Sequence, residues 1–268
     1  MKIADSTVAE LLPAIQVYEN SGGEAYITQM WRYALEDEST DGRKTVLSGR
    51  CDAIPYLPVD LSDYGLSLTE NSSILDVGCL GGYGLYDIAK RLRRDSRPIP
   101  RMVGVDIDSD TIALSKQLAD IWAVDSEVSF DISTAENLSP TIGCFDLVIA
   151  RLVLPYTDVR AAMAAISSVL KEGGIVVLQV HAPSYYLSQA YHSWSSIKKM
   201  IYYIKPVLAW MFFCVMRRQP KSHYFQETAL SSRLLVRQCR KFGLKLLGTS
   251  GFSAKPIFVF GAENAETS

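Results

Sequence analysis

From Ser73 onward, short apolar segments alternate with amphipathic segments, and this alternation constrains the fold more than any other feature. The apolar segments predict strands, and the segments between them predict helices. Expected strands are 73–77, 101–105, 128–132, 145–150, 175–180, 245–248 and 256–261. Expected helices are 83–94, 109–123, 157–170 (ended by Gly173 and Gly174) and 227–242. Strands that alternate with helices of this length indicate an α/β fold with a parallel sheet and right-handed crossovers.

Two segments depart from this rhythm and suggest additions to a central core. Residues 1–70 predict helices followed by an irregular stretch, which we interpret as an N-terminal helical cap. Residues 182–226 are rich in aromatic and basic residues and predict a lid insertion. The core is then formed by residues 71–181 and 227–268. The apolar run 200–216 contains Lys205 and Pro206 and is shorter than the roughly 20 residues needed to cross a bilayer, so we expect no transmembrane span.

Composition excludes several classes of protein. The chain has 268 residues, 48% of them hydrophobic, which is too apolar for a disordered chain. Its five cysteines are scattered, without the spacing of a zinc site or a disulfide framework, so no metal is expected. The first residues lack the pattern of a signal peptide, and we expect a cytoplasmic protein, with peripheral attachment to a membrane as an open alternative.

Charge is distributed unevenly along the chain. Residues 181–250 hold eleven basic residues and one acidic residue, Glu227, for a net charge of +10. The remaining 198 residues hold 16 basic and 28 acidic residues, for a net charge of −12. This division predicts one surface suited to something anionic, either a membrane surface or an acidic carrier protein.

A glycine-rich turn follows the first expected strand. The segment Leu75-Asp-Val-Gly-Cys-Leu-Gly-Gly-Tyr-Gly84 lies where open parallel sheets bind ligands, beyond the carboxyl end of a strand. A dinucleotide-binding turn would need glycines at positions 80 and 83, where the chain has Leu80 and Tyr83. The spacing therefore disfavours an NAD-dependent dehydrogenase.

The turn resembles motif I of the class I S-adenosylmethionine-dependent methyltransferases, Asp/Glu-x-Gly-x-Gly-x-Gly. Asp76, Gly78 and Gly82 match, and Leu80 replaces the middle glycine. The resemblance implies a Rossmann-like, doubly wound sheet of seven strands, mostly parallel with an antiparallel last strand. It implies S-adenosyl-L-methionine as cofactor and S-adenosyl-L-homocysteine as product. Asp106, at the end of the second strand, matches the acid that binds the ribose hydroxyls.

Three further segments, in the family's order, strengthen the resemblance. Residues 128–138 are similar to the motif beside adenine, with Thr134 at the usual acidic position. Residues 145–154 and 170–178 are similar to the fourth motif and to the Gly-Gly entry of the fifth strand. The cofactor-binding residues implied are Asp76, Gly78, Cys79, Gly82, Asp106, Ile107, Thr134, Ala135, Glu136 and Arg151.

The candidate catalytic and acceptor-binding residues follow from position. His181 ends the fifth strand and is the candidate general base, although a structural histidine is the alternative. Aromatic and histidine side chains of the cap and the lid predict an acceptor pocket: Tyr26, Tyr33, Tyr156, Tyr185, Tyr186 and His192.

We therefore expect methyl transfer to the oxygen, nitrogen or carbon of a small acceptor that is largely apolar, lipid-like or anionic. The alternative from another class is a noncatalytic binding or scaffold protein that keeps the fold, which the substitutions at Leu80 and Thr134 would favour. A nucleic-acid acceptor is not expected, because Ala150-Arg-Leu-Val153 differs from the Asn-Pro-Pro-Tyr-like motif of such enzymes.

Overall fold

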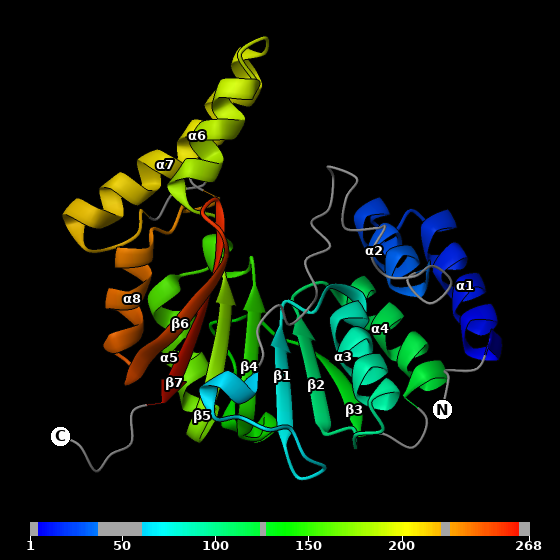
Figure 1. The fold of residues 1–268 in the computed structure, drawn as a ribbon. Helices are drawn as coiled ribbons and strands as arrows, with labels where there is room; N and C mark the ends of the chain where they lie inside the picture. The colour runs from blue at the N-terminus through cyan, green and yellow to red at the C-terminus, as the bar shows by residue number, and fades with distance from the viewer. Residues whose placement is uncertain (1–4, 37–60, 124–126, 221–225, 263–268) are drawn as a thin grey trace. The chain divides into compact units, whose positions relative to one another are not determined.

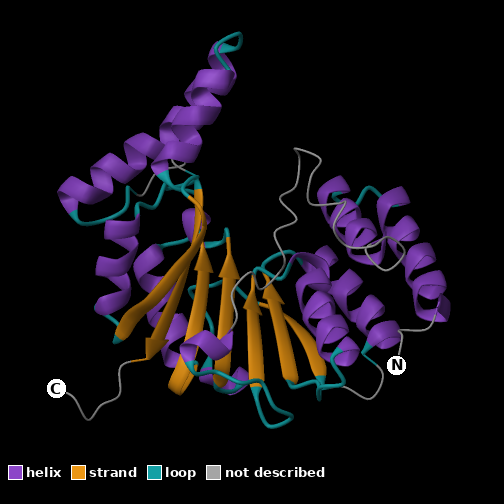
Figure 2. Cartoon of the chain, viewed as in Figure 1, coloured by secondary structure: helices purple, strands orange, loops and turns teal. Residues whose placement is uncertain are grey.

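A computed structural model of the chain describes residues 5–36, 61–123, 127–220 and 226–262. The chain divides into two compact units, Met1–Ser133 and Thr134–Ser268, each described below by itself. The strands form a seven-stranded sheet in the order β3-β2-β1-β4-β5-β7-β6. Helices flank the strands, and the fold is the Rossmann-like, mostly parallel arrangement with an antiparallel last strand that the resemblance implied (Figure 2).

The described residues of the first unit form three parallel strands and four α-helices, which Figure 1 labels. Its elements are α1 (Asp5–Asn20), α2 (Ala25–Glu36), β1 (Ser73–Val77), α3 (Tyr83–Arg94), β2 (Arg101–Asp106), α4 (Ser109–Trp122) and β3 (Val128–Ile132), with short 3-10 turns at Leu61–Tyr64 and Leu80–Gly82. Every residue of β1 is buried, as expected for a strand covered on both faces. Asp108 caps α4, because its carboxylate accepts hydrogen bonds from Asp110 and Thr111 N–H.

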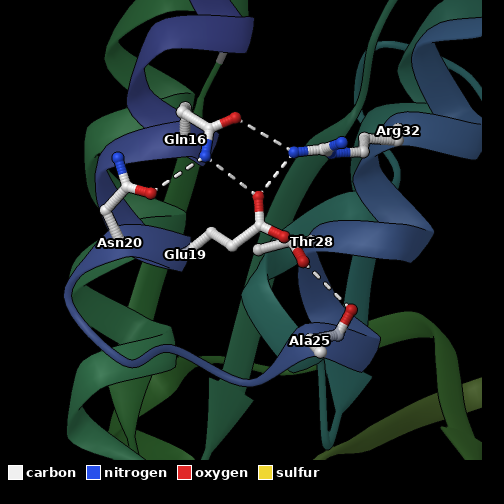
Figure 3. A network of polar contacts seen from close by, with 6 residues as sticks. All are labelled: Gln16, Glu19, Asn20, Ala25, Thr28 and Arg32. Atoms are coloured by element: carbon white, nitrogen blue, oxygen red, sulfur yellow. Dashed lines mark hydrogen bonds and ion pairs between the residues drawn. The ribbon is translucent and has the colours of Figure 1, made fainter.

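Exposed polar side chains join α1 to α2 (Figure 3). Arg32 donates hydrogen bonds to Gln16 Oε1 and Glu19 Oε2, and Gln16 Nε2 donates to Glu19 and Asn20. Surface ion pairs contribute little by themselves. The pairing of the two helices therefore depends mainly on their buried apolar faces, which include Leu11 and Ile27.

The second unit contains two parallel strands, β4 (Phe145–Arg151) and β5 (Leu170–Gln179), followed by an antiparallel pair. β7 (Lys255–Ala262) runs antiparallel to both β5 and β6 (Leu244–Phe252). The helices are α5 (Val159–Ser168), α6 (Pro183–His192), α7 (Ile197–Met216) and α8 (Ser232–Arg240), with 3-10 turns at Pro140–Ile142 and Leu154–Tyr156.

Two predicted helix boundaries were wrong, each because another segment bonds to the backbone. α5 ends at Ser168, and the two glycines at 173 and 174 lie inside β5. The reason is that Phe145 N–H donates to Val169 O, so pairing with β4 begins directly after the helix. Residues 227–230 do not belong to α8. Thr228, Ala229 and Leu230 instead donate their N–H groups to three different segments.

Pro206, which the sequence predicts to break or kink a helix, lies inside one continuous helix of the second unit. α7 begins at Ile197 and continues through Pro206 for 20 residues. It is longer than the apolar run 200–216, whose shortness was the reason to expect no transmembrane span. Within the described ranges it is the one helix long and apolar enough to cross a bilayer by length and composition, a test that helices of water-soluble proteins also pass. The ribbon of α7 bends along its length (Figure 1).

Candidate functional site

The glycine loop of the first unit turns sharply from β1 into α3. Gly78 and Cys79 N–H both donate to Val105 O, at 2.8 and 3.1 Å, which fixes the loop to the end of β2. Gly82 has φ +79°, and a Cβ at this position would lie 2.7 Å from Phe130 Cζ. Leu80, at the middle-glycine position, has φ +44°. The backbone thus keeps a left-handed conformation there, although the side chain makes that conformation costly.

Asp106 ties the carboxyl end of β2 to the same loop. It is buried, and its two carboxylate oxygens accept hydrogen bonds from Leu80 N–H at 3.0 Å and Asp108 N–H at 3.2 Å. A carboxylate has about four acceptor positions. Asp106 therefore retains the capacity to accept two further hydrogen bonds, as the hydroxyls of a ribose would require.

Two further residues of the first unit affect the electrostatics and packing of the loop. Cys79 is buried, and burial raises the pKa of its thiol well above the usual value, with smaller contributions from the negative charges of Asp76 and Asp106. The thiol remains protonated near neutral pH, in agreement with a packing role. Asp76 is itself buried directly before the loop.

A residue that the sequence argument missed supports the loop from α2. The buried Trp31 donates its indole N–H to Gly81 O at 2.9 Å, across 50 residues of sequence. The signal that could have found it is the spacing of Ile27, Trp31 and Leu35, which recur on one face of a helix. The neighbouring Tyr26 is exposed on α2, and the side chain of Tyr33 lies outside the described residues.

The loop and the end of β2 fit an adenosine-bearing cofactor. Glycines let the backbone approach a ligand closely, and the hydrogen-bond capacity of Asp106 suits a ribose. Ile107 directly follows and exposes its apolar side chain, suited to one face of an adenine ring. The fit rests on the geometry of these residues within the first unit.

The remaining cofactor candidates lie in the second unit. Ala135 is buried and Thr134 is partly buried in the connection after β3. Glu136 Oε1 accepts a hydrogen bond from Asp158 N–H at 2.9 Å, next to the start of α5. Arg151, at the end of β4, donates through Nε to Gln179 Oε1 of β5 at 3.3 Å.

A buried cluster of polar and aromatic side chains lies at the end of β5. Tyr186 is 1% exposed and donates its hydroxyl to Glu227 Oε2 at 2.6 Å. Tyr202 donates to Glu227 Oε1 at 2.9 Å. The His181 ring stacks on Tyr185 with centroids 4.1 Å apart, and its Nδ1 lies 3.4 Å from the Tyr186 hydroxyl. Side chains of α6 and α7 thus meet at the Glu227 carboxylate, and the end of β5 joins them through Tyr186.

Hydrogen-bond accounting defines the tautomer of His181. A tyrosine hydroxyl has one proton, and the short contact of Tyr186 with the Glu227 carboxylate uses it. In the longer contact with Tyr186, His181 Nδ1 is therefore the donor. A neutral imidazole with its proton on Nδ1 carries its basic lone pair on Nε2.

The tyrosines around Glu227 resist deprotonation. Burial raises the pKa of Tyr186, and its hydrogen bond to Glu227 raises it further. The same causes raise the pKa of Tyr202 to about 12. The pKa of Tyr156 is also raised, by partial burial and then by the charge of Glu227. All three tyrosines remain hydrogen-bond donors at neutral pH.

The structure brings together most of the predicted acceptor residues of the second unit. His181, Tyr185 and Tyr186 lie in the cluster, and the charge of Glu227 acts on Tyr156. His192 does not join them. It is exposed at the end of α6, and its Nδ1 lies 2.7 Å from Ser188 O. Glu227 and Tyr202 were missed, and the only sequence signal for Glu227 was its isolation as the single acid in a basic stretch.

Within the described ranges, no three His, Cys, Asp or Glu side chains are grouped so that they could hold a metal ion.

The family model described as "Methyltransferase domain" matches residues 68–228. No curated protein matches the sequence.

Several solved structures share the fold. An S-adenosylmethionine-dependent methyltransferase from Clostridium acetobutylicum has 13% identity and a TM-score of 0.53, over 78% of this chain and 90% of that one. PKMT2 from Rickettsia typhi, in complex with AdoHcy, has 16% identity and a TM-score of 0.53, over 80% of this chain and 53% of that one. A geranyl diphosphate methyltransferase, in complex with GPP and sinefungin, has 12% identity and a TM-score of 0.51, over 73% and 72%. The chain thus spans between about half and nine tenths of these structures.

Proposed function

Because the chain belongs to the methyltransferase-domain family, we propose that it methylates a small, largely apolar acceptor that carries an anionic group. The protein is a class I methyltransferase that uses S-adenosylmethionine and yields S-adenosylhomocysteine. The proposal concerns the acceptor and the residues that act on it. It rests on one observation above all, the cluster of tyrosines and His181 around the buried Glu227.

The chemistry of the cluster supports an apolar acceptor with a negative charge. Tyr156 and Tyr202 are 56% and 51% exposed, so aromatic surface is available for packing. Lys255 Nζ lies 5.3 Å from the centre of the Tyr185 ring and provides positive charge at the same place. Geranyl diphosphate, the acceptor named for one protein of this fold, combines an apolar chain with anionic phosphates in this way.

The protein's part in the reaction is alignment and removal of a proton. Bound S-adenosylmethionine supplies a methyl group already activated by its positive sulfur. Holding an acceptor in line with such a group can lower the barrier by about 7–11 kcal/mol. The glycine loop and Asp106 would hold the cofactor, the acceptor would take its methyl group, and the acceptor's proton would pass to His181 Nε2.

Tyr186 and Glu227 position His181 for this step. The Nδ1–H group points to the Tyr186 oxygen, which fixes the ring and leaves Nε2, a buried atom, as the candidate base. When His181 becomes positively charged, the Glu227 carboxylate beyond Tyr186 offsets part of that charge. Glu227 and Tyr186 are positioning residues, and His181 is the candidate base.

Cofactor binding is the first measurement. Isothermal titration with S-adenosylmethionine should show binding by the wild type, strong loss in Asp106→Ala, and no change in the control Asp120→Ala, which alters an exposed acid of α4. Equal binding by the wild type and Asp106→Ala would contradict the assignment of Asp106.

Acceptor preference is the second measurement. S-adenosylhomocysteine formation is compared for prenyl diphosphates, fatty acids and uncharged polar acceptors. We expect turnover with the first two classes. In His181→Gln turnover should fall, and in Glu227→Gln the pH–rate profile should shift while cofactor binding stays unchanged. A preference for uncharged polar acceptors, or cofactor binding with no turnover of any class, would refute the proposed acceptor.

A further inference from the structure

The α6–α7 hairpin leaves most of its apolar surface uncovered. In Figures 1 and 2 the turn between the two helices projects away from the strands of the same unit. α7 buries Pro206, Val207, Ala209 and Phe213, and only 22% of its most apolar 18-residue stretch is buried. A helix with so much free apolar surface indicates an interaction site.

The uncovered residues of α7 form one stripe. Eight large hydrophobic side chains are exposed along the helix, and all but Tyr202 and Met216 form the stripe: Ile197, Ile201, Leu208, Met211, Phe212 and Val215. At about 100° per residue these six positions fall within a sector of roughly 100°. The buried Pro206 and Phe213 lie on the opposite side. One face of α7 is thus held by the protein, and the other is apolar and free.

Positive charge borders the stripe, and the helices α6 and α7 themselves carry no negative charge. Lys198 and Lys205 lie next to it around the helix, and Arg217 and Arg218 follow its last turn. Residues 183–216 contain no aspartate or glutamate. Glu227, the one acid between residues 181 and 250, is buried by its tyrosine partners. An apolar stripe bordered by cations is the pattern of a helix that lies in the headgroup region of an anionic membrane.

Aromatic residues at the tip of the hairpin fit the same surface. Trp194 is 79% exposed and Tyr191 is 76% exposed, both next to the turn that begins α7. Tryptophan and tyrosine favour the boundary between acyl chains and headgroups because one end of each side chain is apolar and the other is polar.

The packed face of α7 argues against insertion across the bilayer. Pro206 O accepts a hydrogen bond from Ala229 N–H at 3.1 Å, and Trp210 Nε1 donates to Ser231 Oγ at 3.2 Å. Tyr202 is bonded to Glu227. A spanning helix would lose these contacts and carry Lys205 near its middle, whereas a helix lying on the surface keeps them.

We propose that the α6–α7 hairpin docks the protein on an anionic lipid membrane, with the apolar stripe of α7 at the headgroup–acyl boundary and the flanking basic residues on the lipid phosphates. An acidic protein would match the charges alone, whereas an anionic bilayer matches both the charges and the long apolar stripe. This docking goes beyond the proposed reaction and holds whether or not the acceptor is a lipid.

Vesicle flotation of the full chain tests the proposal. Vesicles of phosphatidylcholine alone are compared with vesicles that also contain phosphatidylglycerol, at low and high salt. We expect binding to the anionic vesicles that weakens with salt. The variant Lys198→Glu/Arg218→Glu should bind at least 25-fold more weakly, at about 5-fold for each lost positive charge, whereas Lys116→Glu on the exposed face of α4 should bind as the wild type does.

The apolar stripe is tested by Val215→Asp, which changes a side chain that is 78% exposed. The matched control is Val17→Asp on α1, a valine of the other unit that is 63% exposed. Thermal unfolding checks that both variants are folded. We expect loss of vesicle binding in Val215→Asp only.

Fluorescence quenching measures docking of the chain with its apolar stripe and basic residues unaltered. Lipids with brominated acyl chains should quench the fluorescence of Trp194. Trp194→Phe should lose most of that quenching, because Trp31 and Trp122 are buried and Trp210 is partly buried on the packed face of α7. Absence of binding to anionic vesicles, equal binding to neutral ones, or equal loss in Val17→Asp would each overturn the proposal. Self-association that Val215→Asp abolishes, without vesicle binding, would overturn it in favour of a second copy of the chain.

Discussion

Removal of one hydroxyl tests the buried cluster most directly. Tyr186→Phe keeps the ring, which packs with Val207 and Ala229, and deletes the 2.6 Å hydrogen bond to Glu227. Hydrogen bonds to charged groups contribute about 1.5–3 kcal/mol, and no water replaces this one at a site that is 1% exposed. We therefore expect a loss of about 2 kcal/mol in the free energy of unfolding. For a chain of this size that lowers Tm by about 4–8 °C.

Scanning calorimetry at pH 7 measures this shift, with Tyr202→Phe as the matched control. Tyr202 donates to the other oxygen of the same carboxylate but is 51% exposed, so water can replace its hydroxyl. The control should cost about 0.5 kcal/mol or less. A loss in Tyr202→Phe equal to that in Tyr186→Phe, or no loss in Tyr186→Phe, would refute the argument that burial of this bond sets its strength.

Comparison of the wild type with Tyr186→Phe also gives a pH dependence of stability with a defined sign. The pKa of Tyr186 is raised on folding, so its contribution to stability is complete below pH 10, the unfolded value, and is lost as the pH rises toward the folded value. The difference in stability between wild type and Tyr186→Phe should stay constant from pH 7 to about 10. Above that it should narrow by up to about 1.4 kcal/mol per pH unit. A difference that widens above pH 10 would contradict the direction of the shift.

Three further outcomes are expected. Gly82→Ala should lose cofactor binding in calorimetric titration and more than about 2 kcal/mol of stability, because its Cβ would meet Phe130. The control Gly173→Ala has a similar φ but open space around the added Cβ. An equally large loss of stability in the control would show that backbone strain alone is responsible. Trp31→Phe should lose about 1 kcal/mol and weaken cofactor binding through the freed Gly81 carbonyl, and unchanged affinity would separate α2 from the loop's function. Among the described residues, Cys144 and Cys214 are exposed, whereas Cys79 and Cys239 are buried. Alkylation followed by mass spectrometry near neutral pH should label the exposed thiols before the buried ones. Early labelling of a buried thiol would contradict the raised pKa of that group.

The departure at Leu80 illustrates how a sequence mismatch can be resolved by backbone geometry. A leucine at the middle-glycine position raised the alternative of a noncatalytic protein. The structure keeps a positive φ at Leu80 and a hydrogen bond from its N–H to Asp106, so the loop has the conformation that a glycine would adopt. The substitution costs stability, and it does not remove the contact between the loop and the acid at the end of β2.

The sequence alone was sufficient for features that depend on neighbouring residues. Helix α3 occupies 83–94 as predicted. Asp108 and Asp158 directly precede α4 and α5 and accept hydrogen bonds from N–H groups of their first turns. Periodicity and capping act within a few residues, so they can be read from the chain directly.

Only the tertiary structure decided the features whose bonding partners are distant in sequence. Residues 227–230 have the composition of a helix start, yet their N–H groups bond to Pro155, Pro206 and His181, and this extended path carries Glu227 to Tyr186 and Tyr202. Trp31 reaches Gly81 in the same way. A buried donor or acceptor is satisfied by whichever partner packing brings near, and the position of that partner is a property of the whole fold.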